Sequence, residues 1–361
     1  MRLSHFFLDR ACVTCLAPGN SVHHLDHLAV IAYILQLPII TDEESVYQSL
    51  LRYYPQVTPI YIQEHQQVLA YLAERYDILF TSCAHYRSNL SPIFEIIFRK
   101  KMHFCYCPHG NSDKSLDHFQ MQNLSLIYGN QMEERLNKMG TLFQMDRYVQ
   151  TGNYRFPFYQ KYKTFYDEII EREVFSKFTK KQPVILYAPT WPDMESSSSL
   201  LDVGISIIEQ LPNYYNLIVK LHPWLQHRQT GSVFHIQEKY RDKHNVQILS
   251  LFPLVLPLLK RVTIYLGDFS SLGYDFLYFN RPMFFFDSNQ RVRTREEATH
   301  LHSCGMVIPE KSYQKIYNFI EGHAFLQNWY RERRKKLYRY TFGKTCDLDK
   351  LRESIVKKFF H

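Results

Sequence analysis

Residues 262–287 have the pattern of a strand, a hydroxyl-rich turn, a helix and a second strand. The apolar run 262–266 leads into a turn with Ser270 and Ser271, and Pro282 separates the helical stretch from the second apolar run. A helix N-terminus leaves about four backbone N–H groups unpaired and carries about half a positive charge, so it favours an anion. The segment therefore predicts either a phosphate-binding turn or an ordinary capped helix of an α/β protein.

Three further apolar runs end in polar turns that contain Pro or Gly. The runs cover residues 103–107, 184–187 and 217–221, and the turns after them carry His109, Thr190, Trp191 and His222. In open α/β sheets, ligands bind outside the carboxyl ends of parallel strands. All of these turns are therefore candidates for ligand-binding edges.

Strands that alternate with helical stretches run through most of the chain. The first series covers residues 37–41, 77–82, 103–107, 124–129 and 147–152, and the second covers residues 184–187, 217–221, 246–249, 262–266 and 283–286. This alternation predicts βαβ units and parallel sheets. The charged segment 159–182 separates the two series, and 361 residues are enough for two domains. We therefore expect two Rossmann-like α/β domains, residues 1–158 and 159–330, and a basic helical tail, residues 331–361.

The four segments together resemble the CDP-glycerol glycerophosphotransferase family, the teichoic-acid primases and polymerases of the GT-B fold. The resemblance is carried by Ala188-Pro189-Thr190-Trp191, Leu221-His222-Pro223 and Asp268-Phe269-Ser270-Ser271 with Asp275-Phe276. It implies two parallel-sheet domains that face each other across a cleft, with the final helices crossing back onto the first. It also implies a transferase that moves a glycerophosphate or related polyol-phosphate unit from a CDP-activated donor to a hydroxyl acceptor and releases CMP.

Such a transfer needs a base for the acceptor hydroxyl. The family's His-Gly motif places its catalytic histidine at His109, and Gly110 lets the backbone approach a ligand closely. The alternative is a histidine that only orders a turn. The family usually has Thr-Pro-Leu before Lys114, whereas residues 111–113 of this chain read Asn-Ser-Asp. This departure leaves the identity of the acceptor, and activity itself, open.

The donor is expected at the turns of the second domain. Pro223 keeps His222 extended at its strand end, where this second catalytic histidine would donate to a phosphate. Asp275 lies one helical turn after Ser271, and it suits a ribose or polyol hydroxyl better than the role of base. Asp268 either lies beside the bound donor or caps the helix. The expected donor-binding residues are Thr190, Trp191, Lys220, Ser270, Ser271 and Asp275, together with His222.

The sequence favours a metal-independent reaction with no cofactor besides the nucleotide donor, because no Asp-x-Asp pair stands at a strand end to hold Mg²⁺. Two zinc sites are the alternatives, namely Cys12/Cys15 with Cys105/Cys107, or His23 with His27 at one helical turn. The interpretation of residues 22–35 without a metal is an ordinary amphipathic helix. Seven cysteines, an odd number without a secretion signal, favour reduced thiols.

A net charge of +8 indicates anionic partners, and much of the basic excess lies in residues 329–340. This segment is a solvated helix face, an attachment to anionic lipid headgroups or, least favoured, a nucleic-acid contact. The resemblance favours the membrane, because family members act on lipid-linked acceptors at its cytoplasmic face, and we expect no nucleic-acid partner. No apolar run approaches the roughly 18 residues of a membrane span, so a cytoplasmic protein, peripheral on the inner face of the membrane, is expected.

Two other functions stay open. The first is a nucleotide-sugar enzyme of the same fold, either a glycosyltransferase or a UDP-N-acetylglucosamine 2-epimerase-like protein, in which the donor carries UDP. The second is a catalytically silent nucleotide-binding or membrane-adapter protein, which the altered sequence after His109 would allow. The sequence does not decide whether the acceptor is lipid-linked or a glycan hydroxyl.

Overall fold

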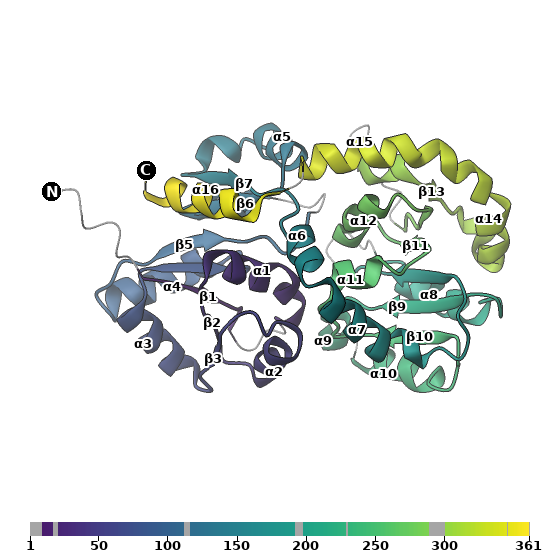
Figure 1. The fold of residues 1–361 in the computed structure, drawn as a ribbon, viewed down its shortest axis with the longest axis horizontal. Helices are drawn as coiled ribbons and strands as arrows, with labels where there is room; N and C mark the ends of the chain where they lie inside the picture. The colour runs from purple at the N-terminus through teal and green to yellow at the C-terminus, as the bar shows by residue number, and fades with distance from the viewer. Residues whose placement is uncertain are drawn as a thin grey trace. The chain divides into compact units, whose positions relative to one another are not determined.

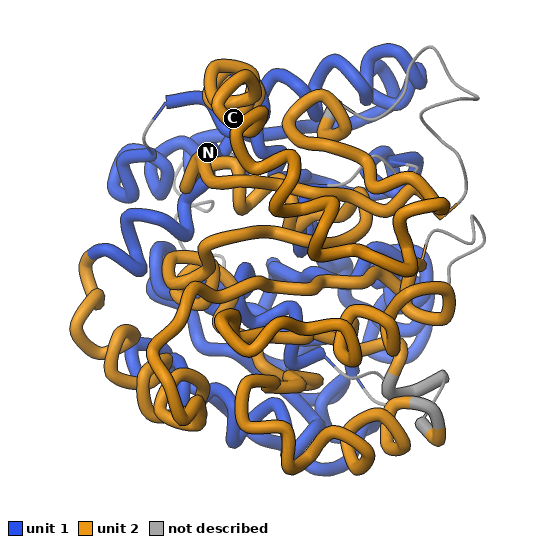
Figure 2. The backbone as a smooth tube through the Cα atoms, turned by 90° about the vertical axis from the view of Figure 1, so that its right-hand side faces the viewer, with its two compact units in different colours: residues 1–160, 340–361 blue, residues 161–339 orange. Residues whose placement is uncertain are grey.

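The computed structural model describes residues 9–16, 21–111, 116–191, 198–228, 230–288, 300–344 and 346–360. The chain forms two compact units, residues 1–160 with 340–361 and residues 161–339 (Figure 2). The expected boundary after residue 158 lies close to this division. The basic tail expected from residue 331 is divided between the units, because residues 331–339 belong to the second.

The first unit is built on a seven-stranded sheet in the order β3-β2-β1-β4-β5-β6-β7, and the paired strands are parallel (Figure 1). Its strands are β1 (Arg10–Val13), β2 (Ile39–Thr41), β3 (Pro59–Tyr61), β4 (Ile78–Thr81), β5 (His103–Tyr106), β6 (Leu124–Ile127) and β7 (Tyr148–Gln150). Its α-helices are α1 (Leu25–Leu35), α2 (Glu44–Tyr53), α3 (His65–Arg75), α4 (Tyr86–Ile96), α5 (Asn130–Lys138), α6 (Arg155–Lys161) and α16 (Leu348–Phe360). Short 3₁₀ helices include η2 (Val22–His24), directly before α1.

The second unit has a six-stranded sheet in the order β10-β9-β8-β11-β12-β13, again with parallel pairing. Its strands are β8 (Val184–Ala188), β9 (Asn216–Lys220), β10 (Val246–Leu249), β11 (Ile264–Gly267), β12 (Met283–Phe285) and β13 (Met306–Val307). Its helices are α7 (Lys163–Glu173), α8 (Leu200–Glu209), α9 (Pro223–Arg228), α10 (Thr230–Lys239), α11 (Val255–Leu259), α12 (Ser271–Phe276), α14 (Ile316–Gly322) and α15 (Arg331–Phe342), which continues into the first unit.

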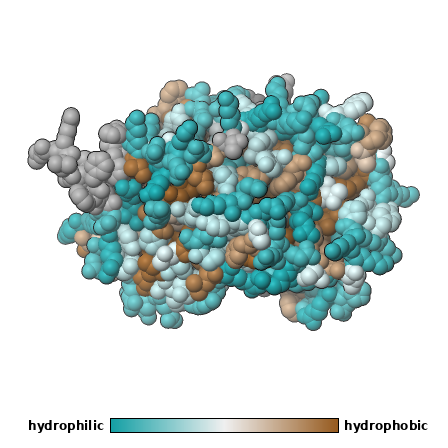
Figure 3. Space-filling view, in the orientation of Figure 1, coloured by the Kyte–Doolittle hydropathy of each residue, from teal (hydrophilic) through white to brown (hydrophobic). Residues whose placement is uncertain are grey.

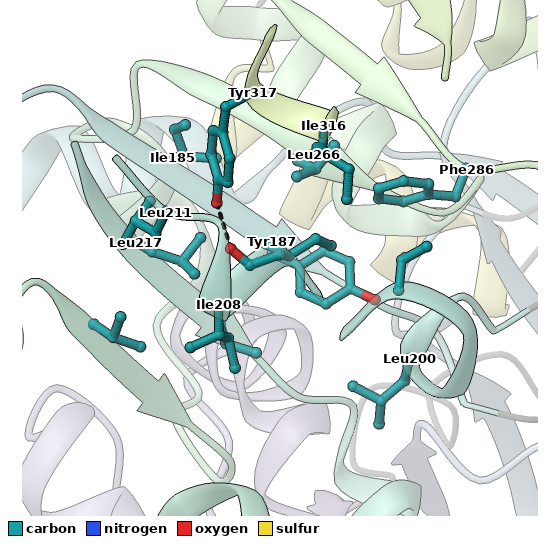
Figure 4. Packing of buried hydrophobic residues seen from close by; sticks show 14 of the residues in the cluster. Ile185, Tyr187, Leu200, Ile208, Leu211, Leu217, Leu266, Phe286, Ile316 and Tyr317 are labelled. Carbon is teal, nitrogen blue, oxygen red and sulfur yellow. Dashed lines mark hydrogen bonds between the residues drawn. The ribbon is translucent and has the colours of Figure 1, made fainter. Parts of the chain in front are cut away.

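The apolar runs form strands because helices cover both faces of a parallel sheet, so the residues of the inner strands are mostly buried. All five residues of β8 and of β9 are buried. Figure 4 shows the core beside β8, where Ile185 and Tyr187 pack with Leu266 of the neighbouring β11 and with Phe286, which follows β12. The expected α/β class with parallel sheets is thus confirmed, although β1, β3 and β13 were not among the expected strands.

Gly267 allows the last residues of β8 and β11 to pair closely. A Cβ atom at this position would lie 2.6 Å from the backbone oxygen of Ala188, so a larger residue would force the strands to shift. The helical stretch after β11 ends at Asn280, which adopts a left-handed conformation with φ 50°. This end agrees with the break expected before Pro282.

A disulfide joins Cys15 and Cys83, in the loops after β1 and β4. The expectation of reduced thiols throughout is therefore wrong for this pair, and the zinc alternative that used Cys15 is not what the structure shows. Cys12, Cys105 and Cys107 are buried free thiols. Burial raises the pKa of Cys12 and Cys105 well above the usual thiol value, which disfavours the thiolate that binds a metal.

Helix α15 contains the basic cluster of the tail, and one member of that cluster is misplaced by the sequence interpretation. Arg334 is 1% exposed, and its guanidinium donates to Asn280 Oδ1 at 2.9 Å and to Gln327 O at 2.9 Å. It is therefore a structural residue, not part of a basic surface. Among the described residues no helix is long and apolar enough to cross a membrane, and hydrophilic residues predominate on the face shown in Figure 3.

Candidate functional site

The order in which strands are added to the second sheet reverses between β8 and β11, which pair side by side. From β8 the chain continues toward one edge of the sheet, and from β11 it continues toward the other edge. Such a switch point is where open α/β sheets bind ligands. The turn after β8 carries Thr190 and Trp191, and the turn after β11 carries Ser270 and Ser271. The ring of His222, after β9, lies 6.2 Å from that of Trp191, so the expected donor-binding turns share one edge of the sheet.

Asp268 joins two of these turns. Its Oδ2 accepts hydrogen bonds from the backbone N–H groups of Thr190 at 2.7 Å and of Ser199 at 3.2 Å. The side chain is buried, and its Oδ1 has no hydrogen-bond partner among the described residues. Burial raises the pKa of this carboxyl from 3.8 to about 7. The alternative in which Asp268 caps α12 is wrong, because the N-cap residue is Ser270.

Ser270 begins the short helix α12 with an extended backbone, φ −130° and ψ 171°, and its side chain makes no capping hydrogen bond. Its Oγ lies 3.2 Å from the hydroxyl of Tyr265, which itself donates to the backbone oxygen of Asp268 at 3.2 Å. Tyr265 therefore orders this turn from within the strand. Sequence reasoning missed this role, because Tyr265 belongs to an apolar run that predicts a core residue.

The protonation of His222 follows from its neighbour Trp224. The backbone N–H of Trp224 donates to His222 Nδ1 at 3.2 Å, so Nδ1 carries the lone pair and the neutral ring has its proton on Nε2. This nitrogen can donate to an anion. The indole of Trp191 lies 6.0 Å from that of Trp224, and Lys220, the last residue of β9, is buried.

Asp275 is also buried, on α12. The structure brings it to the same helix as Ser271, as the spacing predicts. The expected donor-binding residues thus lie in the loops, at a strand end and on α12 at this edge of the second sheet. Which ligand they bind remains a prediction. All of these residues lie in the second unit, as the sequence predicts.

In the first unit, His109 lies in the loop after β5 and is exposed. Hydrogen bonds hold this loop on both sides, since the Tyr128 hydroxyl donates to Pro108 O at 2.8 Å and Asn111 Nδ2 donates to Gln131 Oε1 at 2.6 Å. Gly110 has φ 149°, a conformation that residues with a side chain rarely adopt. Lys114, expected to belong to the same motif, lies outside the described residues.

A buried chain of hydrogen bonds supports the loop that carries His109. Tyr128 gives its proton to Pro108, so it accepts one from His27 Nδ1 at 2.8 Å, and His27 Nε2 then accepts from Arg155 at 3.1 Å. Arg155 also pairs with Asp26 at 2.5 Å, and both side chains are buried. Burial, followed by the charge of Arg155, lowers the pKa of His27 well below its usual value, in agreement with a neutral ring.

Both nitrogens of His27 are thus engaged, and the zinc alternative that paired His27 with His23 is not what the structure shows. His23 instead lies with His24 and His109. Sequence reasoning also missed the pair of Arg155 with Asp26. These residues are 129 positions apart, and no local pattern connects them.

The raised pKa of Asp268 predicts a pH-dependent cost to stability. The carboxyl binds its proton more tightly in the folded state than in the unfolded state, so ionisation costs stability as the pH rises from about 4 to about 7. Asp268→Asn keeps an oxygen for the N–H of Thr190 and removes this cost. Its free energy of unfolding relative to the unsubstituted protein should rise by up to roughly 4 kcal/mol over this range and then level off.

Urea denaturation at a series of pH values measures this difference. Asp242→Asn, which removes an exposed carboxyl of the same unit, is the matched control for the loss of one negative charge. A difference between Asp268→Asn and the unsubstituted protein that stays constant over the whole range would show that Asp268 does not retain its proton.

A family model described as CDP-Glycerol:Poly(glycerophosphate) glycerophosphotransferase matches residues 109–349. Teichoic acid glycerol-phosphate primase from Bacillus subtilis (strain 168) is 29% identical over 162 residues, which cover 42% of this chain and 40% of the primase. The alignment thus spans well under half of that relative.

Solved structures with the same fold include the wall teichoic acid polymerase TagF, with a TM-score of 0.65 and 14% identity over 97% of this chain and 88% of the other. UDP-GlcNAc 2-epimerase from Neisseria meningitidis, bound to UDP-GlcNAc, has a TM-score of 0.57 and 14% identity, covering 97% of this chain and all of the epimerase. These likenesses confirm the expected GT-B-like fold. Because the family model covers more than half of the chain and includes both candidate histidines, the chain belongs to the CDP-glycerol:poly(glycerophosphate) glycerophosphotransferase family.

Proposed function

We propose that this protein is a transferase that moves a glycerophosphate or related polyol-phosphate unit from a CDP-activated donor to a hydroxyl acceptor, with release of CMP. The observation that carries the proposal is the convergence of Thr190, His222 and the Ser270 turn at the switch point of the second sheet. Family membership and the activity named for the related primase support glycerol phosphate as the transferred unit.

In this reaction the acceptor oxygen attacks the phosphorus that carries the polyol, and the bond from that phosphorus to the bridging oxygen of CMP breaks. His222 donates from Nε2 to a phosphate oxygen, and Ser270 and Ser271 donate to others as charge moves onto CMP. Lys220 adds positive charge, and Asp275 accepts from a ribose or polyol hydroxyl. These groups serve in place of a metal ion at the donor.

His109 accepts the proton of the acceptor hydroxyl. Its exposure leaves the ring accessible to a substrate, and the hydrogen bonds at Pro108 and Asn111 hold its loop in place. A base that is positioned before the acceptor arrives loses less entropy during the reaction. The first unit thus supplies the base, and the second unit supplies the groups that bind the donor.

Two substitutions should separate these roles. His222→Ala loses a charge-assisted hydrogen bond of about 1–3 kcal/mol, so calorimetry should show an increase in the Kd for CDP-glycerol of roughly 5- to 150-fold. His109→Ala should leave that Kd nearly unchanged, while CMP release in the presence of acceptor falls by about 10²–10⁴-fold. His244→Ala, at an exposed histidine of the second unit, is the control.

The same measurements test the nucleotide-sugar alternative, which stays open because the epimerase has a similar fold. Tighter binding of UDP-N-acetylglucosamine than of CDP-glycerol would assign the protein to that class. Unchanged CDP-glycerol affinity in His222→Ala, together with unchanged turnover in His109→Ala, would contradict both assigned roles. Donor binding without turnover in the unsubstituted protein, with every acceptor offered, would favour the silent nucleotide-binding alternative.

The proposal includes peripheral attachment to an anionic membrane at its inner face, where a lipid-linked acceptor would reside. Four of the five exposed basic residues of α15 lie near its start, and Trp329, which is 78% exposed, precedes them. Near an anionic surface each basic residue contributes about 1 kcal/mol, and tryptophan settles at the level of the headgroups. These four residues are Arg331, Arg333, Lys335 and Lys336, and the fifth is Arg339. The four near the start of the helix are the ones proposed to contact the membrane.

Replacing these four residues with Gln should abolish sedimentation of the protein with anionic vesicles, while Arg334 is left intact because it is structural. Added salt should weaken binding of the unsubstituted protein. The matched control replaces four exposed basic residues elsewhere in the second unit, namely Arg172, Lys177, Lys180 and Lys181. Equal binding to neutral vesicles, or equal loss in the control, would leave α15 as a solvated helix.

A further inference from the structure

Three histidines from two separate segments meet in the first unit. His23 and His24 lie in η2, and His109 lies in the loop after β5. One ligand nitrogen of each ring lies within 4.8 Å of those of the other two. The ring of His24 lies 4.1 Å from that of His23 and 4.1 Å from that of His109. We propose that these three residues form a binding site for a divalent transition metal ion of the zinc class.

A contact with Cys15 fixes the tautomer of the His24 ring. Its Nδ1 lies 3.4 Å from the sulfur of Cys15, which is part of the disulfide and carries no proton. Nδ1 must therefore be the donor in this contact, and Nε2 then carries the lone pair that a metal needs. Fixing one ring nitrogen through a hydrogen bond is how metal-binding histidines are oriented.

The segment that carries His23 and His24 is held in place from several sides. The backbone N–H of His24 donates to Ser21 O at 2.9 Å, and the Ser21 hydroxyl donates to Cys15 O at 2.8 Å. The disulfide then ties Cys15 to the loop after β4. On the other side, the hydrogen bond from Tyr128 to Pro108 holds the segment of His109. The three rings are thus brought together by the fold and do not depend on one flexible loop.

The ligand set selects the class of ion. Imidazole nitrogens suit zinc, copper, nickel and iron, whereas magnesium and calcium prefer oxygen ligands, and this cluster contains no carboxylate. Zinc–nitrogen bonds of about 2.0–2.1 Å place two ligand nitrogens about 3.3 Å apart in a tetrahedral site. Side-chain rotations that close a gap of at most about 1.5 Å would therefore complete the site. His109 is exposed, so an ion can reach it from solvent.

The location of this site affects the proposed reaction, although the metal site itself does not depend on that proposal. The nitrogen lone pair that His109 gives to a metal ion is no longer available to accept a proton. Metal binding and proton abstraction by His109 therefore exclude each other, and a bound ion would act as an inhibitor of transfer. Direct measurement of metal binding keeps the two proposals separable, because it requires no turnover.

The test uses the full chain with its disulfide intact, stripped with EDTA and dialysed. Titration with Co²⁺ should give the visible absorption of a tetrahedral site, saturating at one ion per chain, and Zn²⁺ should displace the Co²⁺. His23→Gln and His109→Gln should each raise the Kd for Co²⁺ by at least about 10-fold, since even loss of an outer partner of a metal ligand costs that much. His244→Gln should bind like the unsubstituted protein.

Circular dichroism of each variant verifies that the fold is retained. This control is more important for His23→Gln than for His109→Gln, because His109 is exposed. No saturable absorption at millimolar Co²⁺ would overturn the site. Equal affinity in His23→Gln, His109→Gln and His244→Gln would show that the ion binds elsewhere. A thiolate-to-cobalt charge-transfer band would overturn the assignment to three imidazoles, because it requires a cysteine ligand.

Discussion

Parallel strand pairing brings every loop that follows a strand to the same edge of its sheet, and the candidate donor site depends on this constraint. β8 and β11 pair in register up to Ala188 and Gly267, where a larger residue would meet a backbone oxygen. The residues that follow these two strands therefore lie next to each other. Asp268 can then accept the N–H of Thr190, which lies 78 positions earlier in the chain. The turns that would hold the donor are thus ordered before any ligand arrives.

The first unit orders its loop by a different means. Arg155 and Asp26 form a buried ion pair, and the hydrogen bonds continue through His27 and Tyr128 to the backbone beside His109. Removal of one partner from such a pair typically costs about 3–5 kcal/mol, because a buried charge is left without compensation. The same loop is therefore held well enough to present His109 either to an acceptor hydroxyl or to a metal ion.

Local patterns predicted much of the fold. Long apolar runs such as those of β8 and β9 are clear signals because both faces of these strands are buried. β1 was missed, since its four residues begin with the charged Arg10 directly after Asp9 and give no long apolar run, although it is an inner strand of its sheet. The strand-end rule also predicted that Thr190, His222 and Ser270 gather at one edge, because it needs only the order of strands and turns.

Contacts between distant residues could not be predicted in this way. The roles of Asp268 and Arg155 depend on partners far along the chain, which one sequence does not identify. The burial of Arg334 had a weak local signal, because buried Leu337 lies three residues later on the same helical face. The basic composition of the segment hid that signal, since charge alone does not indicate which side of a helix faces inward.

Hydrogen–deuterium exchange of the full chain, with and without CDP-glycerol, tests the central claim most directly. If the carboxyl edge of the second sheet holds the donor phosphates, CDP-glycerol should slow exchange in residues 188–191, 220–224 and 267–272. The strands away from this edge should exchange at nearly the same rate with and without the ligand. Saturating ligand that protects other segments while leaving these three unchanged would contradict the account.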